Sequence, residues 1–191
     1  MTDKMADTLK IGSYNCSGIR QSTVQFIYEM LNEQKMDIML LQETWLTDIN
    51  LRQLGTIHED YFALGITSIP HDKLLMGRPY GGLAILWKKC LSNTMKFKPI
   101  KTETDRIMCM KISWNNRTIL LANLYLPVDN RSMTVVDRTY EQCLLTLEHI
   151  IEEYNCNETI IGGDLNTDIS RDNAHARFLC DFANRNYLVD V

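Results

Sequence analysis

The sequence predicts an α/β domain with mixed β-sheets, and three observations lead to this class. Segments with the apolar period of a helix alternate with short apolar segments of strand length. Some of the strands follow one another across short turns, as antiparallel hairpins do. Apolar residues make up 45% of the chain and charged residues 23%, which is ordinary for a globular protein. The 191 residues suit a single domain with a sizeable core, which we expect to span residues 8–191.

The N-terminal part is expected to form a strand, a helix and a buried strand, in that order. TLKIGSYN (8–15) and MDIMLLQE (36–43) have the length and apolar content of strands. Between them, residues 22–35 carry four apolar side chains on one helical stripe, namely Val24, Ile27, Met30 and Leu31. Ser22 and Gln25 resemble a capping box at the start of this helix.

The middle part is expected to be mostly extended. Segments 61–66, 82–87 and 106–114 have the composition of strands. The pair Asn115–Asn116 is typical of a tight turn, and RTILLANLYLP (117–127) supplies another strand after it. The sequence therefore predicts a hairpin here.

The C-terminal part is expected to contain a helix, a strand and a second helix. The first helix lies near residues 134–154 and carries five apolar side chains on one face: Tyr140, Leu144, Leu147, Ile151 and Tyr154. IIGGDLN (160–166) is the strand. The second helix, near residues 172–184, would bury Ala174, Phe178 and Phe182. The chain has no internal repeat, linker or low-complexity tract.

The stretch ETIIGGDLNTD (158–168) joins a strand to a polar turn. Gly162 and Gly163 let the backbone turn sharply or approach another group closely. If the chain stays extended, Asp164 and Asn166 point to the same face, which places a carboxylate beside an amide. A second interpretation is an Asx-turn that only ends the strand.

Four predicted strands end on a carboxylate, an amide or a phenol. Asn15 follows the first strand, Glu43 the second, Tyr125 the hairpin strand, and Asp164 and Asn166 the late strand. Each has an ordinary alternative as a turn residue, a solvated loop start or a core aromatic residue. Together they suggest a site for a hard cation such as Mg²⁺, which prefers carboxylate and amide oxygens and the phosphates of a substrate.

Charge and cysteine content narrow the class of protein. The formal net charge of −4 gives no support to nucleic-acid binding by a basic surface, although an enzyme that reaches phosphates through a metal ion remains compatible with it. The six cysteines are scattered, and the polar N-terminus carries no signal peptide. We therefore expect reduced thiols in an intracellular protein of the nucleus or cytoplasm. No apolar run is long enough to cross a membrane.

Four short motifs occur in an order that resembles a known superfamily. They are SYNCSGIR with Asn15, LLQETWL with Glu43, NLYLP with Tyr125, and IIGGDLNTD with Asp164 and Asn166. Their order and spacing resemble the endonuclease/exonuclease/phosphatase superfamily, which includes AP endonucleases and deoxyribonuclease I, over nearly the whole chain. GRPYGGLAILWKK (77–89) resembles in particular the endonuclease domains of non-LTR retrotransposons.

This resemblance implies both a fold and a reaction. The fold would be two packed mixed β-sheets flanked by helices, a four-layer α/β sandwich, and the reaction would be the nicking of DNA by phosphodiester hydrolysis. Glu43 would be the principal ligand of Mg²⁺, or of Mn²⁺, with Asn15 on the metal and phosphate side. Asp164 would orient or deprotonate the attacking water, and Asn166 would hold the phosphate. Tyr125 would donate to the developing charge.

The chain departs from the family pattern at its C-terminal end. The family ends in two strands that carry an Asp and then an Asp-His motif, whereas this chain stops at NRNYLVDV. None of the four histidines stands in such a motif; His149 and His175 suit solvated helix positions, and His58 and His71 suit loops. We therefore expect a fold that lacks its last strands, with weak or no activity.

Other functions stay open at this point. The same superfamily fold serves phosphatases and other phosphoesterases, and the chain also fits a non-catalytic remnant. DNA is the expected substrate, and no feature of the sequence suggests a stable protein partner.

Overall fold

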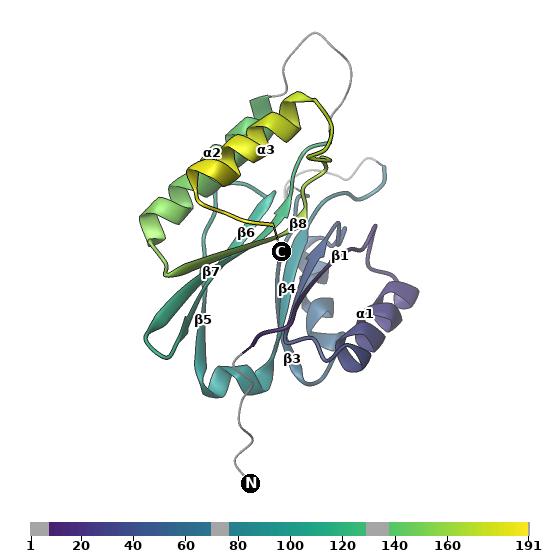
Figure 1. The fold of residues 1–191 in the computed structure, drawn as a ribbon. Helices are drawn as coiled ribbons and strands as arrows, with labels where there is room; N and C mark the ends of the chain where they lie inside the picture. Colours follow the sequence, from purple (N-terminus) through teal and green to yellow (C-terminus); the bar gives the residue numbers. More distant parts are fainter. Residues whose placement is uncertain (1–7, 70–76, 129–137, 191) are drawn as a thin grey trace.

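Two four-stranded β-sheets pack face to face in the computed structural model, which describes residues 8–69, 77–128 and 138–190 (Figure 1). Helix α1 covers the outer face of the first sheet, and helices α2 and α3 cover the outer face of the second (Figure 1). The layers therefore run helix, sheet, sheet, helix. The predicted α/β class, with two packed mixed sheets flanked by helices, is confirmed.

The first sheet has the strand order β1-β2-β4-β3. Strands β1 and β2 are parallel because α1 carries the chain back between them, and β4 pairs antiparallel with both β2 and β3. In chain order its elements are β1 (Ile11–Asn15), α1 (Gln21–Glu33), β2 (Ile38–Gln42), the 3-10 helix η1 (Asp48–Thr56), β3 (Tyr61–Ile66) and β4 (Leu83–Lys88).

The second sheet has the order β5-β6-β7-β8, with β7 and β8 parallel and the other pairs antiparallel. Asn115 and Asn116 both have positive φ, at 46° and 63°, which is the geometry of the predicted hairpin turn between β6 and β7. In chain order the elements are η2 (Lys89–Asn93), β5 (Met95–Ile100), β6 (Ile107–Trp114), β7 (Arg117–Tyr125), α2 (Arg138–Tyr154), β8 (Glu158–Asp164) and α3 (Ala174–Arg185).

Three apolar layers hold these elements together. The layer between the sheets joins side chains of β2 and β4 to those of β6 and β7, including Leu40, Ile85, Met110 and Leu121. The second layer packs Ile27 and Leu31 of α1 on the first sheet. The third packs α2 and α3 on the second sheet through Tyr140, Leu144, Leu147 and Phe182. The alternating faces of the strands explain how one sheet serves two layers.

A buried polar contact joins the two sheets beneath the strand ends. The Gln42 side chain donates from Nε2 to Asn123 Oδ1 at 2.7 Å, and both residues are at most 1% exposed. Asn123 Nδ2 in turn donates to the carbonyl oxygens of Leu41 and Ala84, each at 2.9 Å. Because these groups satisfy one another, the polar pair fixes how β7 lies against β2 and β4.

Two predictions about the helices are wrong. The capping box at Ser22 is absent, because α1 begins at Gln21 and no side chain caps it; Gln25 donates to Glu29 instead. His175 is not solvated but only 4% exposed, and its ring stacks on Tyr140 of α2 with the centroids 3.9 Å apart. The buried residues of α3 are His175, Ala176 and Phe182, so the expected burial is confirmed for Phe182, whereas Ala174 and Phe178 are only partly buried.

Other expectations on histidines and strands have different outcomes. His149 is exposed as predicted, and His58 lies in a loop but is buried. His71 and residues 134–137 of the predicted helix lie outside the described residues. Strand β5 was not predicted, because Pro99 argues against a central strand. Its lysines alternate with apolar residues, which fits the edge strand that the structure shows. Within the described part of the chain, no helix has both the length and the apolar content needed to span a membrane.

Candidate active site

The topology brings four strand ends to one end of the molecule. In the first sheet the parallel pair β1 and β2 ends at Asn15 and Gln42, directly before Glu43. In the second sheet the parallel pair β7 and β8 ends at Tyr125 and Asp164. Because parallel strands present their carboxyl ends at the same edge and the sheets are stacked, these residues meet between the sheets.

The side-chain amide of Asn15 joins the two carboxylates. Its Nδ2 donates to Glu43 Oε1 and to Asp164 Oδ2, each at 2.8 Å, although Asn15 and Asp164 are 149 residues apart in the chain. Its Oδ1 accepts the backbone N–H of Ser17 at 3.0 Å. Since carboxylates only accept hydrogen bonds, the NH₂ group must be the one that faces them. The two N–H bonds of the Asn15 amide therefore link Glu43, directly after β2 of the first sheet, to Asp164 at the end of β8 in the second.

Asp164 takes part in a local turn and in this link at the same time. Its Oδ1 accepts the backbone N–H of Asn166 at 3.0 Å, which is the Asx-turn of the second interpretation. Its Oδ2 is the acceptor of Asn15. The Asn166 side chain donates to the Leu126 carbonyl at 2.8 Å and so ties the turn to the end of β7. The Asx-turn therefore fixes the direction of the Asp164 carboxylate and is compatible with a functional site at this residue.

The paired glycines before Asp164 have different roles. Gly163 has a φ of +127°, and a Cβ there would lie 2.1 Å from the carbonyl oxygen of Leu124 in β7. Only glycine fits this close approach of backbones. At Gly162 a Cβ would meet only the side chain of Leu40, at 2.7 Å. Gly163 therefore sets the direction in which β8 delivers Asp164.

Tyr125 is held in its neutral, donating form. Burial raises its pKa to about 12, and a hydrogen bond to Glu43 and the charges of Glu43 and Asp164 act in the same direction. The nearby Arg106 opposes them without reversing the shift. At neutral pH the phenol therefore keeps its proton beside the two carboxylates.

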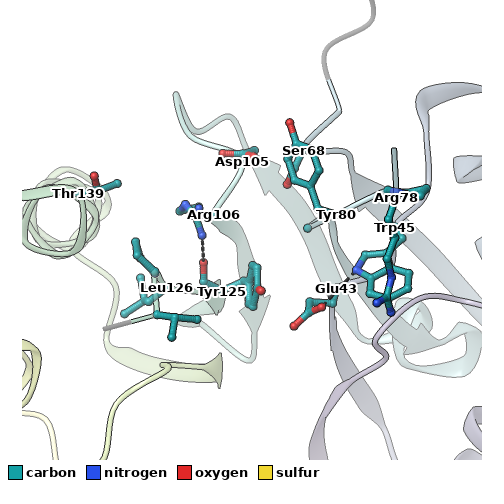
Figure 2. A pocket seen from close by; sticks show the side chains of 14 residues that line it. Glu43, Trp45, Ser68, Arg78, Tyr80, Asp105, Arg106, Tyr125, Leu126 and Thr139 are labelled. Carbon is teal, nitrogen blue, oxygen red and sulfur yellow. Dashed lines mark hydrogen bonds between the residues drawn. The ribbon is translucent and has the colours of Figure 1, made fainter. Parts of the chain in front are cut away.

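An open pocket of about 580 Å³ lies against these residues (Figure 2). Figure 2 shows Glu43 and Trp45 on one side of it and Tyr125 and Arg106 on the other. Of the five predicted site residues, Glu43 and Tyr125 line the pocket, and Asn15 and Asp164 are hydrogen-bonded next to them. Asn166 is not among the lining residues, and its side-chain amide donates to the Leu126 carbonyl. None of the described residues that line the pocket is a histidine.

Sequence reasoning missed three residues of the pocket. Trp45 donates from its indole N–H to Glu43 Oε2 at 3.2 Å, and the guanidinium carbon of Arg78 lies 3.9 Å from the centroid of the Trp45 ring. Arg106 donates to the backbone carbonyl of Tyr125 at 3.3 Å (Figure 2). The available signals were the position of Trp45 two residues after Glu43 and the place of Arg78 in the GRPYGG segment.

The donor set suits a hard divalent cation. Glu43 and Asp164 offer carboxylate oxygens bridged by one amide, and Mg²⁺ in proteins uses one or two carboxylates together with water and phosphate. Among the described residues, no three or more His, Cys, Asp and Glu side chains gather as a metal site. Carboxylate and amide oxygens are donors of the kind that hard cations such as Mg²⁺ and Mn²⁺ take.

Several solved structures are similar to this one. The endonuclease domain of TRAS1, a telomere-specific non-LTR retrotransposon, has a TM-score of 0.65 at 15% identity, covering 93% of this chain and 71% of that one. The AP endonuclease LMAP from Leishmania major has a TM-score of 0.67 at 16% identity, covering 93% and 66%. A humanized D. rerio TDP2 has a TM-score of 0.60 at 17% identity, covering 88% and 65%.

At these identities the likeness shows the fold, and the chain spans about two thirds of the length of the three structures. No curated protein matches the chain significantly. The sequence itself matches the endonuclease/exonuclease/phosphatase family over residues 12–182, which include every strand except the first residue of β1. The chain belongs to the endonuclease/exonuclease/phosphatase family.

Proposed function

We propose that this chain is a divalent-metal-dependent phosphodiester hydrolase that nicks DNA, with Mg²⁺ as the ion and Mn²⁺ as a substitute. The observation that carries the proposal is the Asn15 amide, which donates to the Glu43 and Asp164 carboxylates from two different sheets, beside the pocket that Glu43 and Tyr125 line. DNA as the substrate is supported by similar structures described as endonucleases. A retrotransposon origin is supported by the fold shared with the TRAS1 domain and by the resemblance of residues 77–89.

The proposed roles follow from what each side chain donates or accepts. Glu43 would hold the ion, with Asn15 beside it, and an ion bound there supplies charge neutralisation for the phosphate and the departing oxygen. Asp164, an acceptor at the end of β8, would orient or deprotonate the attacking water. Tyr125, kept protonated, would donate to the charge that develops on the phosphate. Asn166 would contact the phosphate from the turn.

We expect this chain of 191 residues to hydrolyse phosphodiesters slowly. A general acid–base group contributes roughly 10²–10⁴-fold to a rate, and such a group is most often a histidine. No histidine lines the pocket among the described residues. Among the described residues, Asp164 would then be the main proton acceptor.

Nicking of supercoiled plasmid in Mg²⁺ tests the assignment. Glu43→Gln keeps the shape of the side chain and removes its charge, so we expect nicking to fall by about 10²-fold or more. Asp164→Ala should lose activity to a similar extent. Glu158→Gln is the matched control, since Glu158 is exposed at the start of β8 and pairs only with the exposed Arg117.

Calorimetric titration with Mn²⁺ separates metal binding from turnover. Glu43→Gln should weaken Mn²⁺ binding, and Glu158→Gln should leave it unchanged. Binding by Glu43→Gln that equals the parent chain's would contradict the role of Glu43. A DNA oligonucleotide with a 3′-phosphate extends the test: hydrolysis of that monoester alone would favour a phosphatase, and Mn²⁺ binding without any hydrolysis would favour a non-catalytic remnant.

A further inference from the structure

We infer that Trp45 is a positioning residue that, together with Asn15, fixes the orientation of the Glu43 carboxylate. The inference rests on the proposed role of Glu43 as the metal ligand. It also gives a role to the GRPYGG segment (77–82), which none of the proposed catalytic roles uses.

Both oxygens of the Glu43 carboxylate have a donor. Asn15 Nδ2 reaches Oε1 at 2.8 Å, and the indole N–H of Trp45 reaches Oε2 at 3.2 Å (Figure 2). The Tyr125 phenol also hydrogen-bonds this carboxylate. Donors on both oxygens restrict the rotation of the carboxylate about its last bond more than donors on one oxygen do. Donors of this kind around a metal ligand fix its orientation and commonly affect affinity for the ion.

The backbone around Glu43 is strained in a way that delivers Trp45 to this contact. Glu43 and Trp45 both have positive φ, at 50° and 56°, a region that side chains other than Gly, Asn and Asp rarely adopt. Four backbone hydrogen bonds from two segments hold the strained turn. The N–H groups of Trp45 and Thr44 donate to the Gly81 and Gly82 carbonyls at 2.9 and 3.1 Å, and the N–H groups of Gly18 and Ile19 donate to the Glu43 and Thr44 carbonyls at 2.8 and 3.0 Å. The GRPYGG segment is thus one of the two supports of the metal-ligand turn.

The indole ring itself is confined. A Cβ on Gly18 would lie 2.2 Å from a ring carbon of Trp45, so the Gly18 backbone touches the ring directly. Arg78, from the same GRPYGG segment, stacks its guanidinium on the ring at 3.9 Å from the centroid. The ring therefore has little freedom to swing its N–H away from Glu43.

A pair of tryptophan substitutions tests the positioning role. Trp45→Phe keeps an aromatic ring for Gly18 and Arg78 but removes the N–H donor. Trp87→Phe is the matched control, because the indole N–H of Trp87 is buried without a hydrogen-bond partner among the described residues and its ring stacks on Phe97. We expect Mn²⁺ affinity to fall about tenfold in Trp45→Phe and to stay unchanged in Trp87→Phe.

The kinetic and spectroscopic readouts distinguish positioning from simple packing. In Trp45→Phe, kcat should fall while KM for plasmid DNA stays near the parent value. In an NMR spectrum, the indole N–H resonance that disappears in Trp45→Phe is assigned to Trp45. Without metal, Glu43→Gln should shift this resonance and leave the indole resonances of Trp87 and Trp114 in place. An indole resonance that does not respond to Glu43→Gln overturns the inference.

Arg78→Gln supplies a second variant if Trp45→Phe folds poorly. It removes the stacked cation and keeps the indole donor, so Mn²⁺ affinity should fall in the same direction by a smaller factor, with Arg52→Gln on η1 as the exposed control. The two claims fail separately when Glu43→Gln has lost Mn²⁺ binding. In that case, unchanged Mn²⁺ binding in Trp45→Phe overturns the positioning role of Trp45 and leaves the proposed function standing. If Trp45→Phe does not fold, unchanged binding in Arg78→Gln has the same meaning. Unchanged binding in Glu43→Gln overturns the proposed function.

Discussion

At the scale of single residues, Asn15 is the residue that lets the carboxylates of Glu43 and Asp164 lie close together. Glu43 and Asp164 would repel each other at short range, and the NH₂ group of Asn15 places a donor against each. The same amide accepts from Ser17, so its orientation is fixed on both sides. The stability of this cluster in the absence of metal therefore depends on the neutral side chain of Asn15, which donates to both carboxylates.

Changing Asn15 to Asp replaces that shared donor with a third carboxylate. We expect Asn15→Asp to lower the free energy of unfolding by about 1–3 kcal/mol in the absence of metal, because charged groups lose a partner and gain a repulsion. Mn²⁺ should then raise the thermal midpoint of Asn15→Asp more than that of the parent chain. Asn15→Ala, which loses the donor without adding charge, is the comparison. Equal stability of the two variants without metal would argue against a repulsion between carboxylates.

At the scale of elements, β8 combines ordinary pairing with one exceptional residue. It pairs in parallel with β7 over its whole length, and Gly163 lets the backbones approach closely just before Asp164. Strand β8 is an edge strand of its sheet. Its isoleucines are therefore only partly buried, whereas the sequence predicted a buried strand.

The two neighbouring glycines of β8 provide an internal comparison. Gly163→Ala should lower the free energy of unfolding by about 3 kcal/mol or more, because both its φ and the β7 backbone oppose a side chain. Gly162→Ala should cost about 1 kcal/mol, since only the flexible Leu40 side chain must move. Urea unfolding of both variants measures the difference. Equal losses would mean that β7 yields to a side chain at Gly163.

The sequence predicted those elements whose side chains alternate or repeat clearly. Strands β2, β3, β6 and β7 and the three α-helices agree with expectation within a few residues, because their apolar pattern is set by the layers they face. Strand β5 was missed although its lysines alternate with apolar residues, because Pro99 argues against a strand. The cap of α1 was misplaced because a capping box depends on backbone geometry at one residue.

The sequence predicted those candidate site residues whose side-chain chemistry is visible at the ends of strands. Carboxylates and amides at strand ends are visible in the sequence, and the structure brings Asn15, Glu43 and Asp164 together. Trp45 and Arg78 were not predicted, because their contribution depends on a strained turn and on a stack between distant segments. Residues that act through another side chain have no sequence pattern of their own.

At the scale of the whole molecule, each apolar layer contains a tyrosine whose pKa is raised. Burial raises the pKa of Tyr61, in the layer beneath α1, and that of Tyr125, between the sheets, to about 12. Burial also raises the pKa of Tyr140, beneath α2, above its ordinary value. In the unfolded chain a tyrosine ionises near pH 10. Alkaline pH therefore acts on all three layers at once.

Burial also raises the pKa of the Cys16 and Cys109 thiols to about 12. Because a thiol in the unfolded chain ionises near pH 8.5 and a tyrosine near pH 10, we expect the free energy of unfolding to fall as pH rises from about 8 through 12. The sign follows because the unfolded state loses its thiol and tyrosine protons first and is thereby favoured. Urea unfolding over this range measures the slope. Tyr61→Phe should flatten it, whereas Tyr187→Phe, at a position 94% exposed, should not change it. A slope that Tyr61→Phe leaves unaltered would assign the loss to other groups.

The separation of 149 residues between Asn15 and Asp164 also orders events during translation. Asn15 and Glu43 leave the ribosome early and can fold with the first sheet, but the second carboxylate does not exist until β8 has been made. A nascent chain therefore carries half of the proposed site until β8 has been made. Under the proposed function, a newly made protein cannot cut nucleic acid near its own ribosome until Asp164 has emerged and β8 has paired with β7.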